Sequence, residues 1–236
     1  MITLTAVLFV GGESRRMGAD KATLRWQGEP LWSRQRRTLR MLETQKILIS
    51  ARTRPAWCPA DSAIILDEPP SRGPLSGLAA ALMQIETTHL LALAVDLPQM
   101  RSDFLWELWR EAASGVGVVP ELDGFYEPLC AVYPVEAAAH AARQIQRGQL
   151  ALQSFVRTLC AANLLQTKVV TNRDLFLNLN TPAAGHILVA QPSCGLAPYA
   201  PATTLPRPSP VLGFLSGDQN RDALGAPLGG QPPGHP

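Results

Sequence analysis

The fold of this chain is indicated by residues 6–21, AVLFVGGESRRMGADK, in which an apolar run passes directly into a glycine-rich, basic loop. Two glycines at the end of a strand allow a close approach of the backbone, so that successive N–H groups can converge on phosphate oxygens. Arg15, Arg16 and Lys21 would neutralise negative charge there. The residues therefore predict a phosphate-binding loop, with a tight turn bearing solvated arginines as the alternative.

The spacing within this loop excludes two common nucleotide-binding motifs. Five residues separate Gly12 from Gly18, and Lys21 follows three residues later, so the loop is not G-x-x-x-x-G-K-[ST]. Nor does it read G-x-G-x-x-G.

Apolar runs rich in Val, Ile and Leu alternate with segments of helical period, which is typical of an α/β protein with a mostly parallel, buried sheet. The expected strands are Leu4–Val10, Lys46–Ser50, Ala63–Leu66, Leu90–Val95, Gly117–Val119, Leu129–Tyr133 and Lys168–Thr171. The expected helices are Leu31–Leu42, Leu75–Ile85, Ser102–Ala113, Val135–Gln146 and Gln149–Leu159. Residues 1–185 are predicted to form one domain, followed by a Pro- and Gly-rich, disordered tail over 186–236.

Composition limits the classes of function. The 236 residues are 46% hydrophobic with a net charge of only +2, which argues against a nucleic-acid-binding protein. Eleven of the 21 basic residues nevertheless lie between Arg15 and Arg54, which favours a small polyanionic ligand. The four widely spaced cysteines suggest neither a zinc site nor disulfides, and they fit a cytoplasmic location. The apolar N-terminal run is too short for a membrane span, and we expect no membrane partner.

Polar side chains follow three further segments. Asp96 ends a buried strand at LALAVDLP, where a carboxylate can hold Mg²⁺ against phosphate oxygens; the alternative is a helix cap, although Ser102 or Asp103 would cap the next helix better. Asp67 ends the preceding strand before a Pro- and Gly-dense turn, and it is as readily explained by an Asx turn. Asn178 and Asn180 share one face of an extended segment, with turn formation before proline as the favoured alternative.

Taken together, the pattern strand-GG-x-S-R-R-M-G-x-D-K, D-x₅-GPLSG, VDLP and N-x-N-T-P resembles the molybdenum cofactor guanylyltransferases of the MobA type over about residues 2–185. The resemblance implies a Rossmann-like, three-layer nucleotidyltransferase fold. It also implies transfer of GMP from Mg-GTP to the terminal phosphate of Mo-molybdopterin, with release of pyrophosphate.

The resemblance also implies roles for individual residues. Asp96 would bind Mg²⁺ and nucleotide, and Lys21 with Arg15 or Arg16 would stabilise phosphate charge. The remaining binding residues implied are Leu8, Gly11, Gly12, Asp67, Asn178 and Asn180. The strand at Tyr126–Tyr133 is similar to one that borders the pterin pocket in the family.

The chain departs from the family pattern in places. Ser50-Ala51-Arg52 stands where the family usually offers an asparagine to the nucleotide, and Ala183–His186 replaces an acidic continuation. A molybdopterin cytidylyltransferase, or another NTP transferase of the same fold, is the nearest alternative, although Gly11-Gly12 before Glu13 favours guanine by family pattern. An inactive nucleotide-binding adaptor for cofactor delivery is a further alternative. Transient contacts with delivery proteins or molybdoenzyme apoproteins are expected both of the enzyme and of such an adaptor.

Overall fold

The computed structural model describes residues 1–11, 20–66 and 73–179, and the predicted tail and domain boundary lie outside these residues. The helices are α1 (Leu31–Arg40), α2 (Pro74–Gln84), α3 (Ser102–Glu111), α4 (Ala137–Gln146) and α5 (Leu152–Ala161), with 3₁₀ turns η1 (Lys21–Thr23) and η2 (Arg173–Phe176). The strands are β1 (Leu4–Phe9), β2 (Arg25–Trp26), β3 (Glu29–Pro30), β4 (Lys46–Ala51), β5 (Ala63–Leu66), β6 (His89–Ala94), β7 (Gly117–Leu122), β8 (Phe125–Tyr126), β9 (Cys130–Pro134) and β10 (Leu165–Val170).

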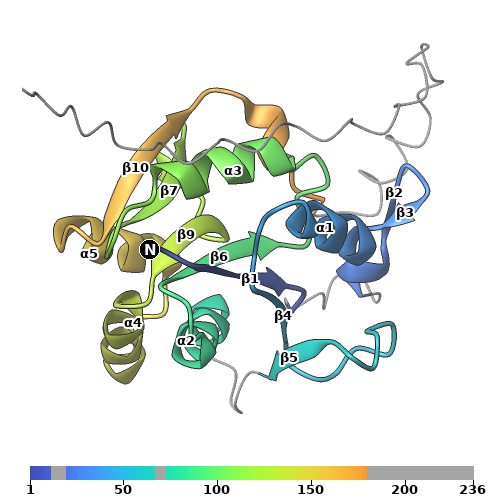
Figure 1. Cartoon of the computed structure of the whole chain (residues 1–236), viewed down its shortest axis with the longest axis horizontal. Coiled ribbons are helices and arrows are strands. Elements are labelled where there is room, and N and C mark those ends of the chain that lie inside the picture. Colours follow the sequence, from blue (N-terminus) through green and yellow to red (C-terminus); the bar gives the residue numbers. More distant parts are fainter. Residues whose placement is uncertain (12–19, 67–72, 180–236) are drawn as a thin grey trace, which may run out of the picture. The chain divides into compact units, whose positions relative to one another are not determined.

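An eight-stranded sheet forms the centre of the molecule, with strand order β10-β7-β9-β6-β1-β4-β5 and β8 paired to β7 (Figure 1). The pairs β6–β1, β1–β4, β4–β5 and β7–β10 are parallel. Strand β9 runs antiparallel to both of its neighbours. The prediction of a mostly parallel sheet is confirmed.

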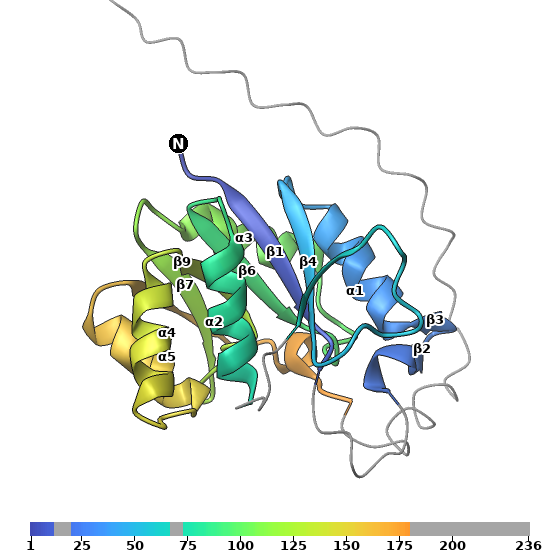
Figure 2. The same ribbon diagram turned by 90° about the horizontal axis from the view of Figure 1, so that it is seen from below.

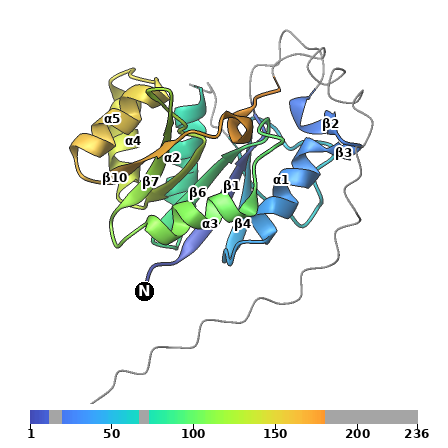
Figure 3. The ribbon, with the colours of Figure 1, turned by 90° about the horizontal axis from the view of Figure 1, so that it is seen from above.

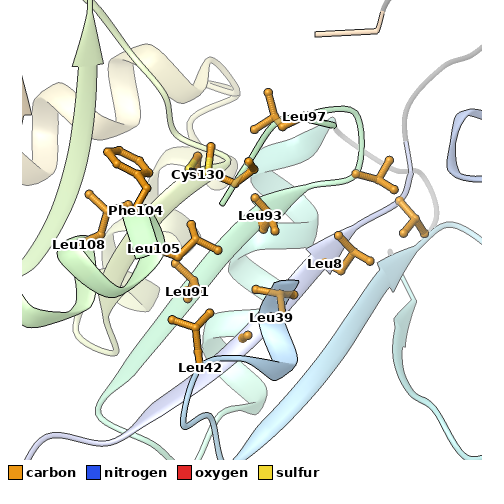
Figure 4. Close-up of a cluster of buried hydrophobic side chains, with 14 of the residues drawn as sticks. Leu8, Leu39, Leu42, Leu91, Leu93, Leu97, Phe104, Leu105, Leu108 and Cys130 are labelled. Atoms are coloured by element: carbon orange, nitrogen blue, oxygen red, sulfur yellow. Dashed lines mark hydrogen bonds between the residues drawn. The ribbon is translucent and has the colours of Figure 1, made fainter. Parts of the chain in front are cut away.

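Helices cover both faces of the sheet and make it a three-layer structure. Helices α2 and α4 lie in front of the sheet in Figure 2, whereas α1 and α3 lie in front of it in the opposite view of Figure 3. The alternation of side chains along β1 supplies both cores, because Leu8 packs on the α1/α3 side and Val7 on the α2/α4/α5 side. Figure 4 shows Leu8 with Leu39 of α1 and Leu105 of α3 in the first of these cores.

Helix boundaries follow local sequence signals. Pro74 occupies the first turn of α2 directly after Gly73, as expected of a proline with a preset φ. The predicted break between α4 and α5 is confirmed at Gly148, which has a φ of 70°. The expected strands and helices are all present, with ends that shift by a few residues.

Two hairpins were not predicted. Strands β2 and β3 are joined through Gln27 and Gly28, and β7 and β8 through Asp123 and Gly124; all four residues have positive φ. Positive φ at both central residues is the requirement of a type I′ turn. The Asp-Gly pair was a readable turn signal, whereas strands of two residues are too short to show an alternating pattern.

Candidate active site

The carboxyl ends of β1, β4 and β6 meet at one edge of the sheet. The Val10 amide donates to the Ser50 carbonyl (3.1 Å) and the Val95 amide donates to the Phe9 carbonyl (3.0 Å), so the three strand ends are held in register. Strands β4 and β5 follow β1 in the chain and lie on one side of it in the sheet, whereas the next strand, β6, lies on the other side of β1. The order of the strands thus reverses at β1, and open α/β sheets bind their ligands at the carboxyl ends of the strands beside such a reversal.

Lys21 and Asp96 form an ion pair at this edge. The Lys21 Nζ lies 3.2 Å from Asp96 Oδ2, and the two side chains are 22% and 17% exposed. Lys21 is the first residue of η1, and the next residue, Ala22, is completely buried and anchors the turn. An ammonium group and a carboxylate are thus presented side by side, 75 residues apart in sequence, with part of each surface still open to a ligand.

Asp96 is not a helix cap. The residue before α3 is Arg101, which makes no side-chain cap hydrogen bond, so the expectation that Ser102 or Asp103 caps this helix through its side chain is wrong in detail. Asp103 Oδ1 instead accepts from the Phe104 amide (2.8 Å) inside the first turn, because Asp103 is already helical. The carboxylate of Asp96 is therefore free of a capping role and pairs with Lys21 at the sheet edge.

The segment that carries Asn178 reaches the same edge. The Leu179 amide donates to the Asp96 carbonyl (3.1 Å), and the Leu179 side chain is buried in the core. Asn178, the preceding residue, is exposed. The structure therefore brings the first of the two predicted asparagines close to Asp96.

Gly11 and Leu8 differ in their exposure to solvent at this edge of the sheet. Gly11 is exposed, and a Cβ built on it would lie 3.7 Å from the Ala51 Cα and from the Arg52 nitrogen. Gly11 thus lies beside Ala51 and Arg52, which stand where the family usually has its asparagine. Leu8 is completely buried in the core, so it supports this edge of the sheet from within and is not open to a ligand.

A half-buried carboxyl group that sequence reasoning did not single out lies near Asp96. Glu127 precedes β9, which pairs antiparallel with β6, so the start of β9 lies beside the end of β6. Burial raises the pKa of Glu127 above its ordinary value, and the negative charge of Asp96 raises this pKa further. The signal available in the sequence was an acid directly before a buried strand, but only the antiparallel direction of β9 brings it to this edge.

Several of the clustered arginines have structural partners. Arg37 forms an ion pair with Glu29 at 2.6 Å, and Arg34 donates through Nε to the Pro98 carbonyl. The pKa of Glu29 is lowered, mainly by this hydrogen bond from Arg37. Part of the basic excess between Arg15 and Arg54 is therefore engaged in contacts of α1, whereas Lys21 lies at the sheet edge. The predicted site residues Gly12, Arg15, Arg16, Asp67 and Asn180 lie outside the described residues.

Two general properties bear on the chemistry of the site. Within the described part of the chain, no three His, Cys, Asp or Glu side chains gather into a group that could hold a metal ion. None of the helices in residues 1–11, 20–66 and 73–179 has both the length and the apolar character needed to cross a membrane.

The fold matches solved nucleotidyltransferases. The molybdopterin-guanine dinucleotide biosynthesis protein A of Archaeoglobus fulgidus superimposes with a TM-score of 0.59 at 21% identity, covering 78% of this chain and 96% of that one. The 2-C-methyl-D-erythritol 4-phosphate cytidylyltransferase of Thermus thermophilus gives a TM-score of 0.56 at 14% identity, covering 78% and 96%. These likenesses show that the chain has the three-layer α/β fold of these nucleotidyltransferases.

Sequence comparison gives the family within this class. Residues 6–164 match the MobA-like NTP transferase domain. A probable molybdenum cofactor guanylyltransferase of Opitutus terrae is 39% identical over 160 residues, covering 66% of this chain and 79% of the relative. The molybdenum cofactor guanylyltransferase of Pseudomonas fluorescens strain Pf0-1 is 34% identical over 181 residues, covering 75% and 88%. The chain belongs to the MobA-like NTP transferase family.

Proposed function

We propose that this protein transfers GMP from GTP to the terminal phosphate of Mo-molybdopterin and releases pyrophosphate. The observation that carries the proposal is the Lys21–Asp96 pair at the reversal of strand order, in a chain 39% identical to a relative named as a probable molybdenum cofactor guanylyltransferase. The pair supplies one cation for phosphate oxygens and one carboxylate for a metal ion, which are the two groups that phosphoryl transfer requires of a protein.

The residues at this edge fit Mg²⁺. The ion is usually held by one or two carboxylates together with substrate phosphates, and it does not need an all-protein cage. The Asp96 side chain is 17% exposed and carries a second oxygen besides Oδ2, and Glu127 lies close enough for its pKa to respond to the Asp96 charge. Asp96 would hold the ion, which when bound would neutralise phosphate charge.

The rest of the mechanism concerns the chain's own groups. A terminal phosphate oxygen of the pterin substrate attacks the α-phosphorus of GTP, and the bond from this phosphorus to the oxygen bridging to the β-phosphate breaks. The side chain of Lys21 donates to the phosphate oxygens that gain charge as pyrophosphate leaves. Gly11 lies beside Ala51 and Arg52 and, having no side chain, would let the nucleotide approach its backbone closely. Positioning and charge stabilisation then suffice, without a side-chain nucleophile.

The remaining predicted residues have supporting positions in this proposal. Asn178, exposed beside Asp96, would contact the pterin phosphate or the metal ion. Gly12, Arg15, Arg16, Asp67 and Asn180 keep the roles that the family resemblance implies. Transient docking to delivery proteins or molybdoenzyme apoproteins is part of the same proposal.

The test measures pyrophosphate release by the full chain with Mg-GTP or Mg-CTP, each with and without molybdenum-loaded molybdopterin. Release that requires both GTP and the pterin supports the proposal. Release with CTP and not with GTP would indicate cytidylyl transfer instead. The fold match to a cytidylyltransferase is consistent with that activity. Nucleotide binding without any release would favour the inactive adaptor.

A further inference from the structure

The loop between β4 and β5 holds a tryptophan against the start of the Lys21 turn. The Trp57 ring stacks on Trp32 of α1, with ring centroids 4.9 Å apart and an interplanar angle of 18°. The next residue, Cys58, is buried, and the Arg54 guanidinium donates to the carbonyls of Pro59 and Ala60 (2.9 and 2.8 Å). The loop is thus tied both to itself and to the core, and the indole has a defined position.

The indole N–H is directed at Asp20. Trp57 Nε1 donates to Asp20 Oδ2 at 2.7 Å, across 37 residues of sequence. The other carboxylate oxygen, Oδ1, accepts from the Ala22 amide at 3.0 Å and caps η1. The Asp20 carbonyl accepts from the Thr23 amide at 3.0 Å and from the Thr23 hydroxyl at 2.7 Å. A single aspartate therefore links the tryptophan loop to the turn that begins with Lys21.

Lys21 lies between two anchors. On one side, Asp20 is held by Trp57 through its carboxylate; on the other, Ala22 is completely buried in the core. The backbone of Lys21 is fixed by both neighbours, and its side chain reaches Asp96 at 3.2 Å. Rotation of the Asp20 carboxylate would weaken the cap on η1, so the direction of the Lys21 side chain depends on the indole hydrogen bond.

The hydrogen bond itself contributes little to global stability. It is exposed to solvent, where exchange with water makes a hydrogen bond weak in net terms. Packing of the Trp57 ring comes instead from Trp32 and the adjoining core, and a phenyl ring would retain much of it. The N–H can therefore be removed while the loop remains packed, which separates positioning from folding.

We propose that Trp57 is a positioning residue for nucleotide transfer, which through its indole N–H and the Asp20 carboxylate sets the direction in which Lys21 meets the substrate phosphates. This inference rests on the proposed function for the identity of the nucleotide. It assigns to the β4–β5 loop, through Asp20, a part in phosphate binding.

The experiment compares Trp57→Phe with Trp106→Phe as a matched control. Trp106 also donates its indole N–H, to the Met41 carbonyl at 3.3 Å, but it lies on α3 away from Lys21. Two readouts are taken on the full chain: KM and kcat for Mg-GTP, and hydrogen–deuterium exchange of residues 20–26 without nucleotide. Asp20→Asn is the second variant, because it leaves Trp57 in place and keeps one acceptor oxygen, which can serve either the indole N–H or the Ala22 amide and not both.

We expect Trp57→Phe to raise the KM for Mg-GTP about fivefold and to lower kcat about twofold, since Lys21 contacts phosphate oxygens both in the bound nucleotide and as pyrophosphate leaves. Exchange at residues 21–24 should accelerate in Trp57→Phe and in Asp20→Asn, and not in Trp106→Phe. The double variant should be no worse than Asp20→Asn, because the two residues act through one bond.

An unchanged KM in Trp57→Phe, or an equal change in Trp106→Phe, would overturn the proposal. If Trp57→Phe does not fold, the same criteria apply to Asp20→Asn. Failure of the proposed function is distinguishable, because a wild-type chain that does not use Mg-GTP removes the KM readout for every variant. Exchange measured without nucleotide then decides: unchanged exchange in Trp57→Phe overturns the positioning role, and accelerated exchange supports it.

Discussion

About a fifth of the side-chain surface of Asp96 and of Lys21 is exposed to solvent. This exposure decides how substitutions at the pair are expected to behave. Ion pairs that stay in contact with solvent contribute only about 1 kcal/mol or less to folding, because the Coulomb energy is screened and side-chain entropy is lost. The pair therefore contributes little to the stability of the fold. Its value lies in what the two groups do when a ligand joins them.

Asp96→Asn should lower the rate of pyrophosphate release about 100-fold or more, because a neutral amide holds a metal cation much more weakly than a carboxylate does. The midpoint of thermal unfolding should stay close to that of the wild type. Asp61→Asn, at an exposed carboxylate in the β4–β5 loop, is the control and should keep full turnover. Near wild-type turnover in Asp96→Asn would remove this residue from the mechanism.

Lys21→Ala should weaken Mg-GTP binding, because the ammonium group that meets the phosphates is lost. Titration calorimetry should show a dissociation constant about tenfold higher, which corresponds to about 1.4 kcal/mol. Lys46→Ala removes an exposed ammonium group at the opposite end of β4 and should leave the dissociation constant unchanged. Equal affinities in all three proteins would contradict the phosphate contact.

Strand β7 begins at a position, Gly117, where no side chain can be accommodated. A Cβ on Gly117 would lie 2.0 Å from the Val132 carbonyl oxygen of β9 and 2.9 Å from the Leu165 side chain of β10. The first neighbour is backbone inside a sheet and cannot move aside. Only glycine lets the chain enter β7 between its two partner strands.

Gly117→Ala should lower the free energy of unfolding by about 2 kcal/mol or more, since overpacking against fixed backbone forces the strands apart. Gly28→Ala is the matched control: it has a positive φ of 83° but nothing within 4 Å of a built Cβ. It should cost only about 1 kcal/mol, from backbone strain. Urea unfolding of both variants provides the measurement, and a smaller loss in Gly117→Ala than in Gly28→Ala would contradict this reading of the β7 packing.

Strand β6 begins with a histidine that makes stability depend on pH. His89 is completely buried, with Nδ1 2.9 Å from the Thr88 hydroxyl and Nε2 3.3 Å from the Val116 carbonyl. Burial lowers the pKa of His89 below its ordinary value of 6.5. The unfolded chain therefore binds a proton at a higher pH than the folded protein does.

Stability should accordingly fall as the pH drops from 6.5 towards the lowered pKa of His89, with a slope of up to about 1.4 kcal/mol per pH unit from this group. His89→Gln should remove this part of the slope below about pH 6.5, whatever its effect on stability at neutral pH. His140→Gln, at a less buried histidine on α4, should change the slope less. Urea unfolding at several pH values distinguishes the two, and parallel slopes for wild type and His89→Gln would refute the assignment.

At the scale of the whole molecule, two hydrophobic cores enclose the sheet, and each is built from residues before 180 in the part of the chain that the structure describes. The last residue of the α1/α3 core is Leu179, which is also hydrogen-bonded to Asp96. The α2/α4/α5 core ends earlier, at Leu165. The predicted domain, residues 1–185, contains both cores and the Lys21–Asp96 pair at the sheet edge.

A chain truncated after Gly185 should therefore keep its thermal midpoint and its rate of pyrophosphate release, because it loses only the Pro- and Gly-rich tail. A second truncation after Asn172 removes η2 and Leu179 together with the core packing of Phe104 against Phe176, and it should lower both quantities. Scanning calorimetry and the release assay provide the measurements. A large loss of stability in the longer chain would contradict the predicted boundary.

Local sequence patterns predicted much of this architecture. Runs of buried strand such as LALAV and helical spacing such as that of Leu31, Gln35 and Leu39 are properties of a few neighbouring residues, and the elements follow from them. The glycine-rich loop after β1 and the acid after β6 were predicted at the sheet edge, because parallel strands place their carboxyl ends together. The 3.2 Å contact of Lys21 with Asp96 bears out the placement of those two residues at one edge.

What only the tertiary structure decided are contacts between residues that are distant in sequence. The antiparallel direction of β9 brings Glu127 beside Asp96, and the path of the β4–β5 loop brings Trp57 to Asp20. Strand direction and loop path depend on how whole elements pack, and no local period encodes them. The sequence by itself therefore determined the elements and the edge at which the chemistry lies. The structure decided which side chains surround Lys21 and Asp96, because those neighbours arise from long-range packing.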